Sequence, residues 1–163
     1  MTVTSVQKDT EALAMTITAE FDAPIERVWQ MWENPRQLER WWGPPTYPAT
    51  FTTHELRPGA QSDYYMTGPN GEQPRGWWMI VEVQPPSRIV LRDGFADEHG
   101  QPDPTFPEGI MRVFMEDIGD GRTRMSINSE FPSAEAMEKL LAMGMEDGMK
   151  QAVGQIDAIL AEG

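Results

Sequence analysis

The chain contains no cysteine and only two histidines, His54 and His99. The absence of cysteine excludes disulfides, thiolate zinc sites and cysteine nucleophiles, and it fits a reducing compartment. The two histidines show no spacing typical of a metal site, and His99 lies in an acidic loop that we interpret as solvated. No serine-nucleophile or phosphate-binding motif is present either. We therefore expect no metal and no other cofactor.

Long apolar runs are also missing. The longest, WWMIV at residues 77–81, is far shorter than a membrane-spanning helix. The first residues, MTVTSVQKDTEALAMT, show neither the basic region nor the apolar region of a signal peptide. We expect a cytoplasmic protein with no membrane insertion.

Basic residues are scarce, with 13 Lys and Arg against 26 Asp and Glu and a net charge of −13. A chain with this balance and no basic stripe would be repelled by phosphate backbones, so nucleic acid is excluded as a partner. A length of 163 residues with 39% apolar side chains is enough for one core. We expect residues 1–163 to form a single domain.

The N-terminal part predicts one strand followed by two short helices. Apolar and polar residues alternate over residues 13–21, as in a half-buried strand. Asp22, with Pro24 and Glu26 after it, is typical of a helix start. Asn34-Pro35 ends this helix and begins a second one, which is expected to carry Trp41 and Trp42 and to stop at Gly43.

The rest of the chain predicts six strands and one long helix. Turn sequences separate the strands, which cover residues 49–56, 61–67, 76–84, 87–95, 109–117 and 122–131. Ser133 is a plausible N-cap for a helix that reaches about residue 161. The order β-α-α-β6-α predicts an α+β fold, with a curved antiparallel sheet wrapped around the long C-terminal helix.

Several segments carry a resemblance to a known superfamily. Residues 20–44, EFDAPIERVWQMWENPRQLERWWGP, resemble the START-like, helix-grip superfamily called SRPBCC. Within it the chain is similar to the subgroup related to the activator of the 90-kDa heat-shock protein ATPase. Three further segments agree with this subgroup, at residues 55–72, 81–90 and 144–160. Met149 departs from the pattern, because the family usually has Trp there, and Ala60 replaces a Gly.

The resemblance implies a helix-grip fold, in which apolar ligands commonly lie between the C-terminal helix and the sheet. It does not imply one activity. The superfamily includes lipid carriers, hormone receptors, cyclases, hydrolases and co-chaperone domains.

Glycine and methionine in the last helix are the main indications of a cavity. Gly144 and Gly148 each cost about 1 kcal/mol relative to Ala inside a helix. They allow close packing on the sheet, or leave empty volume, or face solvent. The chain also has 12 methionines, whose flexible thioethers suit either ordinary core packing or an adaptable apolar pocket.

Neighbouring residues of a helix point about 100° apart, so Trp41 and Trp42 cannot share a face. We predict that one enters the core while the other covers the sheet edge, with structural anchoring and ligand contact as alternative roles. The predicted ligand-binding residues come from this pair, the inner faces of the strands and the last helix. They are Trp41, Trp42, Phe51, Ser62, Tyr64, Met66, Met111, Val113, Met125, Ile127, Leu141, Gly144, Met145 and Gly148.

Three functions remain open at this stage. The first is binding of a small hydrophobic molecule, lipid-like or polyketide-like, beneath the last helix. The second is a co-chaperone-like module with a chaperone partner. The third is a cyclase or hydrolase, for which a buried polar pair would be the indication. Glu82 and Arg112 are expected on outer strand faces, so no catalytic residue is predicted, and the loop at residues 94–109 is a possible lid.

Overall fold

A computed structural model describes residues 3–162, so residues 1, 2 and 163 of the predicted domain lie outside the described part. One antiparallel sheet of eight strands has the order β1-β2-β8-β7-β6-β5-β4-β3. Its strands are β1 Val3–Asp9, β2 Ala14–Phe21, β3 Ala49–Thr53, β4 Gln61–Met66, β5 Arg75–Gln84, β6 Arg88–Ala96, β7 Gly109–Gly119 and β8 Arg122–Glu130. The helices are α1 Ile25–Glu33, α2 Pro35–Leu38, α3 Ala134–Ala142, α4 Met145–Gly154 and α5 Ile156–Leu160.

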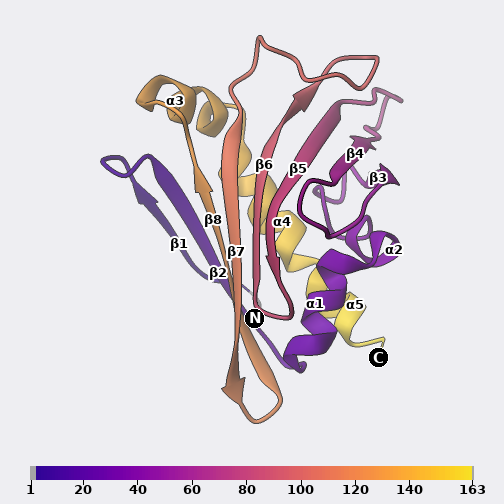
Figure 1. The fold of residues 1–163 in the computed structure, drawn as a ribbon, viewed down its shortest axis with the longest axis vertical. Helices are drawn as coiled ribbons and strands as arrows, with labels where there is room; N and C mark the ends of the chain where they lie inside the picture. Colours follow the sequence, from indigo (N-terminus) through magenta and orange to yellow (C-terminus); the bar gives the residue numbers. More distant parts are fainter. Residues whose placement is uncertain (1–2, 163) are drawn as a thin grey trace.

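The helices lie against one face of the curved sheet (Figure 1). Helix α4 crosses this face, with α1, α2 and α5 gathered at one end and α3 at the other. The predicted α+β class and the curved antiparallel sheet are confirmed. Within residues 3–162, no helix combines the length and the apolar character needed to cross a membrane.

The N-terminal strand β1 was not predicted. Its sequence, VTSVQKD, has apolar residues only at Val3 and Val6 and is mostly exposed, so it lacks the period-two pattern that identifies a half-buried strand. The strand is nevertheless paired with β2, from Val3 opposite Ala19 to Asp9 opposite Ala14. Backbone hydrogen bonding to a neighbour, rather than burial of its side chains, accounts for this edge strand.

The prediction of a single long C-terminal helix is wrong, because the segment consists of the three helices α3, α4 and α5. The first break is at Gly144, which adopts a left-handed conformation with φ +91° and forms the N-cap of α4. Glycine has no Cβ and enters this region without steric cost. The predicted start is confirmed, since the Ser133 side chain accepts a hydrogen bond from the Ala136 N–H.

The two N-terminal helices are shorter than predicted. Pro24 rather than Asp22 occupies the N-cap of α1, and α2 ends at Leu38. Trp41 and Trp42 therefore lie in the turn after α2, although the Trp42 N–H still bonds to the Leu38 carbonyl at 2.9 Å.

The core lies between the helices and the inner face of the sheet. Its largest part contains four tryptophans that contact one another, Trp32, Trp41, Trp42 and Trp78. A second, smaller cluster forms under α3 around Met15, Ile17, Phe131 and Met137. The tryptophan cluster closes the end of the sheet covered by α1, and space remains toward α3.

Candidate ligand-binding cavity

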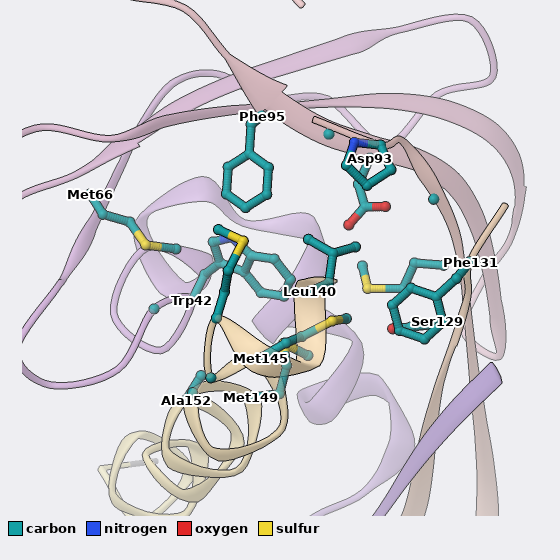
Figure 2. A pocket seen from close by; sticks show the side chains of 18 of the residues that line it. Trp42, Met66, Asp93, Phe95, Ser129, Phe131, Leu140, Met145, Met149 and Ala152 are labelled. Atoms are coloured by element: carbon teal, nitrogen blue, oxygen red, sulfur yellow. The ribbon is translucent and has the colours of Figure 1, made fainter. Parts of the chain in front are cut away.

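A cavity of about 310 Å³ lies between α4 and the inner face of the sheet (Figure 2). This volume is within the range of small-molecule sites, at its lower end. The lining residues are mainly apolar and come from the Trp42 turn, β4, β6, β7, β8 and the segment from α3 through α4. They are Trp42, Gly43, Pro44, Tyr64, Met66, Asp93, Gly94, Phe95, Pro107, Gly109, Ile110, Met111, Ser129, Glu130, Phe131, Leu140, Met143, Gly144, Met145, Gly148, Met149 and Ala152.

The two glycines of the α4 segment have different reasons to be glycine. Gly144 needs its positive φ, whereas Gly148 is inside the helix with no such requirement. A Cβ added at Gly148 would meet no atom within 4 Å, so close packing on the sheet does not explain it. Gly148 lines the cavity, and the empty-volume alternative therefore holds at this position.

Trp41 and Trp42 are both buried in the same core cluster and their rings contact each other, so the prediction that one of them covers the sheet edge is wrong. The Trp41 ring packs edge-on against Trp32 at 4.9 Å between centroids, and its indole N–H donates to the Met31 carbonyl at 2.8 Å. Trp42 packs edge-on against Trp78 at 4.9 Å and also lines the cavity. Trp41 is therefore the structural anchor, and Trp42 is the member of the pair that a ligand could contact.

Half of the predicted site residues line the cavity. Those that do are Trp42, Tyr64, Met66, Met111, Gly144, Met145 and Gly148. Those that lie outside its lining are Trp41, Phe51, Ser62, Val113, Met125, Ile127 and Leu141. The strand residues of the second group follow the same alternation as those of the first, but the alternation does not show which end of the inner face is covered by other side chains.

Packing explains the residues that lie outside. Met125 contacts the Trp32 indole N–H, with 3.3 Å between Nε1 and Sδ, and Val113 and Ile127 belong to the same buried cluster. The Phe51 ring stacks on Tyr64 at 4.9 Å between centroids. Leu141 packs in the smaller cluster under α3.

The Ser62 hydroxyl is hydrogen-bonded to His54, a residue to which the sequence analysis gave no role. The His54 ring joins the Ser62 hydroxyl to the Trp32 carbonyl, with 2.8 Å from Nδ1 and 2.7 Å from Nε2. Since a carbonyl only accepts, Nε2 carries a proton and Nδ1 is free to accept from Ser62. Burial lowers the pKa of His54, which keeps the ring neutral. Ser62 is therefore a structural residue.

Asp93 is the main polar feature of the cavity, and sequence analysis missed it. Its carboxylate points into the space bounded by Phe95, Leu140 and Phe131 (Figure 2). The period-two pattern of β6 indicated it. Ile89, Leu91 and Phe95 occupy inner-face positions, and Asp93 is the acidic residue at the inner-face position between Leu91 and Phe95. An acidic residue at a core-facing strand position calls for an explanation.

The environment of Asp93 changes its acidity. Burial raises its pKa to about 6, and the nearby Glu108 carboxylate acts in the same direction. Burial also raises the pKa of the Tyr64 hydroxyl, which therefore stays protonated. Gly109 is opposite Asp93 on β7, and a Cβ there would lie 3.2 Å from Oδ1. The glycine leaves room for the carboxylate.

The loop from residue 97 to 108 packs beside the cavity. The Phe95 and Phe106 rings are 4.9 Å apart, and Lys139 of α3 lies over Phe106 and donates to the Thr105 carbonyl at 3.2 Å. The loop thereby contacts α3 as well as the end of β6. That it opens and closes as a lid stays a prediction.

Glu82 and Arg112 point away from the cavity, as expected. Arg112 pairs with Glu130 at 2.8 Å and Glu82 pairs with Arg88 at 2.8 Å. Residues 3–162 contain no group of three or more His, Asp or Glu placed to hold a metal ion.

Several solved structures are similar to this chain. A protein from Arthrobacter aurescens is 54% identical, with a TM-score of 0.95 over 99% of this chain and 94% of that one. A protein from Mycobacterium smegmatis is 45% identical, with a TM-score of 0.89 over 97% and 96%. The AHSA1 protein from Silicibacter pomeroyi is 18% identical, with a TM-score of 0.72 over 91% and 97%, and shows the same fold.

A search of curated proteins finds no match. The sequence profile of one family, described as "Activator of Hsp90 ATPase homolog 1-like protein", matches residues 22–161. This match covers α1 through α5 and every strand from β3 to β8. The predicted helix-grip fold and subgroup are thus confirmed, and the chain belongs to the family of Activator of Hsp90 ATPase homolog 1-like proteins.

Proposed function

We propose that the protein binds a small, mainly apolar molecule in the cavity between α4 and the sheet. The observation that carries the proposal is the open space beneath Gly148, in a cavity of about 310 Å³ with mostly apolar walls. Protein interiors are normally packed to the density of organic crystals. A cavity of this size therefore needs a reason, and a guest molecule supplies one.

The side chains around the space suit such a guest. Five methionines line the cavity, Met66, Met111, Met143, Met145 and Met149, and their flexible side chains adapt to irregular apolar surfaces. Met143 is 53% exposed although it lies at the junction of α3 and α4. This exposed apolar side chain at the edge of the cavity is in a suitable place to contact an entering ligand.

Gly148→Trp tests the proposal by filling the cavity. Because a Cβ at Gly148 meets open space, the ring has room to enter the cavity without displacing backbone. We expect the variant to fold with a free energy of unfolding at least equal to that of the wild type. Its uptake of an apolar fluorescent probe, measured by titration, is expected to be lost.

Gly154→Trp is the matched control. Gly154 is the last residue of α4, is exposed, lies outside the cavity lining and also has no atom within 4 Å of an added Cβ. This variant should bind the probe as the wild type does. Equal binding by Gly148→Trp and Gly154→Trp would show that the probe does not occupy the cavity.

A second candidate function is acid–base catalysis, and Asp93 is the observation that favours it. A carboxyl with a pKa of about 6 can exchange a proton near neutral pH, as a general acid or base requires. Tyr64, which also carries a protonatable hydroxyl, is another lining residue of the cavity. Hydrolysis of apolar model esters, compared between wild type and Asp93→Asn, tests this function, and equal rates in both proteins would exclude Asp93 as the group responsible.

A chaperone partner also stays a prediction, supported by the description of the family. Stimulation of the ATPase of a 90-kDa heat-shock protein by the purified chain would support it. The Gly148→Trp variant separates this function from ligand binding, because a surface that contacts a chaperone does not need an empty cavity.

A further inference from the structure

The charge distribution inside the cavity restricts the chemistry of its ligand. Among the described residues that line it, none is Lys, Arg or His, whereas Asp93 presents a carboxylate. Glu130 also belongs to the lining, but its carboxylate is bonded to Arg112 at 2.8 Å. Asp93 takes part in none of the ion pairs formed within residues 3–162.

The charged side chains of the segments around Asp93 have other partners. Glu108 precedes β7 and is itself acidic, and it pairs with Arg92, whose guanidinium lies 2.6 Å from Oε1. Lys139 of α3 is directed to the Thr105 carbonyl and the Phe106 ring. From β4, Tyr64 offers a neutral hydroxyl. A carboxylate held in apolar surroundings without a cation is costly, so a ligand that supplies the cation would gain from it.

Aromatic rings surround the same part of the cavity. Figure 2 shows Asp93 with Trp42, Phe95 and Phe131 around the space that its carboxylate enters. Ring faces attract ammonium groups through their quadrupole. A carboxylate together with aromatic walls is therefore suited to a positively charged nitrogen more than to a neutral hydroxyl, and it repels a carboxylate.

We propose that the ligand is an apolar molecule bearing an amine, whose ammonium group contacts the Asp93 carboxylate. The inference rests on the proposed function and names the ligand class for the same cavity. It excludes free fatty acids and other organic anions as preferred ligands, since residues 3–162 place no cation in the lining. The net charge of −13 acts in the same direction, because it attracts cations to the protein as a whole.

Three probes of equal chain length test the proposal: decylamine, decanol and decanoate, each below its micelle concentration. Calorimetric titration of the full chain is done at a pH of about 7.5, above the pKa of Asp93. The amine should bind most tightly, the alcohol less tightly and the acid most weakly. Asp93→Asn should weaken the binding of decylamine about ten- to hundredfold, as expected for loss of a charged hydrogen bond. It should leave the affinity for decanol unchanged. Lowering the pH through about 6 should weaken the binding of decylamine to the wild type but not to Asp93→Asn.

Glu108→Gln is the matched control, because it removes a neighbouring carboxylate that pairs with Arg92. It should leave the preference for the amine intact. If decanol binds and decylamine binds no better, or if Asp93→Asn keeps the amine preference, the ligand class is wrong while the apolar site stands. If none of the three probes binds, the proposed function fails and the ligand class fails with it.

Discussion

At the scale of single residues, Gly144 and Gly148 show how the same amino acid serves different purposes within one turn. Gly144 has φ +91° and begins α4, whereas Gly148 is helical and stands over the cavity. Neither has an atom within 4 Å of an added Cβ. Backbone conformation alone therefore distinguishes the cost of a side chain at the two positions.

Alanine substitution should separate these purposes. Gly148→Ala should raise the free energy of unfolding by about 1 kcal/mol through helix propensity. Gly144→Ala should lower it by about 1–2 kcal/mol, because L-residues are strained in the left-handed region. Urea denaturation of both variants measures the two values. Changes of the same sign would show that the backbone conformation at Gly144 does not decide its residue type.

Asp93 gives a stability prediction that depends on pH. Burial raises its pKa from the ordinary value of 3.8 to about 6, so the folded chain binds this proton more tightly than the unfolded chain. The stabilisation is complete below about pH 4 and is lost as the pH rises through about 6. Asp93→Asn should therefore be more stable than wild type at a pH of about 8, by up to about 3 kcal/mol.

The same variant should have almost no such advantage at a pH of about 3, below the ordinary pKa of 3.8, because Asp93 is then mostly protonated in both the folded and the unfolded chain. Urea unfolding of the ligand-free proteins at the two pH values makes this comparison. An advantage of Asp93→Asn that is equal at both pH values, or larger at the acidic one, would contradict the burial of this carboxylate.

At the scale of elements, His54 joins three parts of the fold. It follows β3, and its ring bonds to Ser62 of β4 and to the carbonyl of Trp32 in α1. Ser62 is fully buried, so it has no water to replace a lost partner. The ring therefore holds the end of α1 against the β3–β4 edge of the sheet.

His54→Ala should lower the free energy of unfolding by about 2–4 kcal/mol, since two buried polar groups lose their partner. His54→Gln, which keeps one donor and one acceptor, should recover part of this loss. Denaturation midpoints of the two variants provide the measurement. Equal stability of the alanine variant and the wild type would show that the two hydrogen bonds contribute nothing net.

Most elements could be predicted from the sequence because their signals are local. Alternation identified β2, turn sequences separated the six strands from β3 to β8, and the capping of α3 by Ser133 was predicted from residue type alone. Strand β1 has too few apolar residues to show a period. The break at Gly144 was missed because a glycine inside a helical pattern does not reveal its φ angle.

The cavity was only partly predictable, because alternation gives the face of a strand and not the position of empty space. Tyr64, Met66 and Met111 were correctly placed in it, whereas Val113 and Ile127 share the inner face and lie outside the lining. Their exclusion depends on Trp32 and its neighbours, which come from a distant part of the chain. Asp93 could have been predicted as a cavity residue, because it is an acidic residue at an inner-face position of β6 whose other inner-face residues, Ile89, Leu91 and Phe95, are apolar.

At the scale of the whole molecule, the two ends of the sheet are packed differently. Tryptophans fill the end under α1, and methionines with an open volume occupy the end under α3 and the start of α4. Rigid rings stabilise the fold at one end, and adaptable side chains remain where a ligand would enter. The proposed ligand site would thus use a different end of the core from the one that the tryptophans fill, with Trp42 at the boundary between them.

A ligand that occupies the cavity should stabilise the whole chain. At a free concentration one hundred times the dissociation constant, the gain is about 2.7 kcal/mol. Thermal unfolding with increasing probe should therefore show a rising midpoint for the wild type and for Gly154→Trp. The midpoint of Gly148→Trp should not change, and an equal rise in that variant would indicate binding elsewhere.

The most direct test of the central claim is an NMR measurement on methionine methyl groups labelled with ¹³C, in the presence of decylamine. Four of the five methionines that line the cavity, Met66, Met111, Met145 and Met149, are less exposed than Met143, whereas Met31 and Met115 are buried outside its lining. We predict intermolecular NOEs from the ligand to the first four methyl groups and none to the last two. NOEs to Met31 or Met115, or none to any methyl group of the cavity at saturating ligand, would contradict the account.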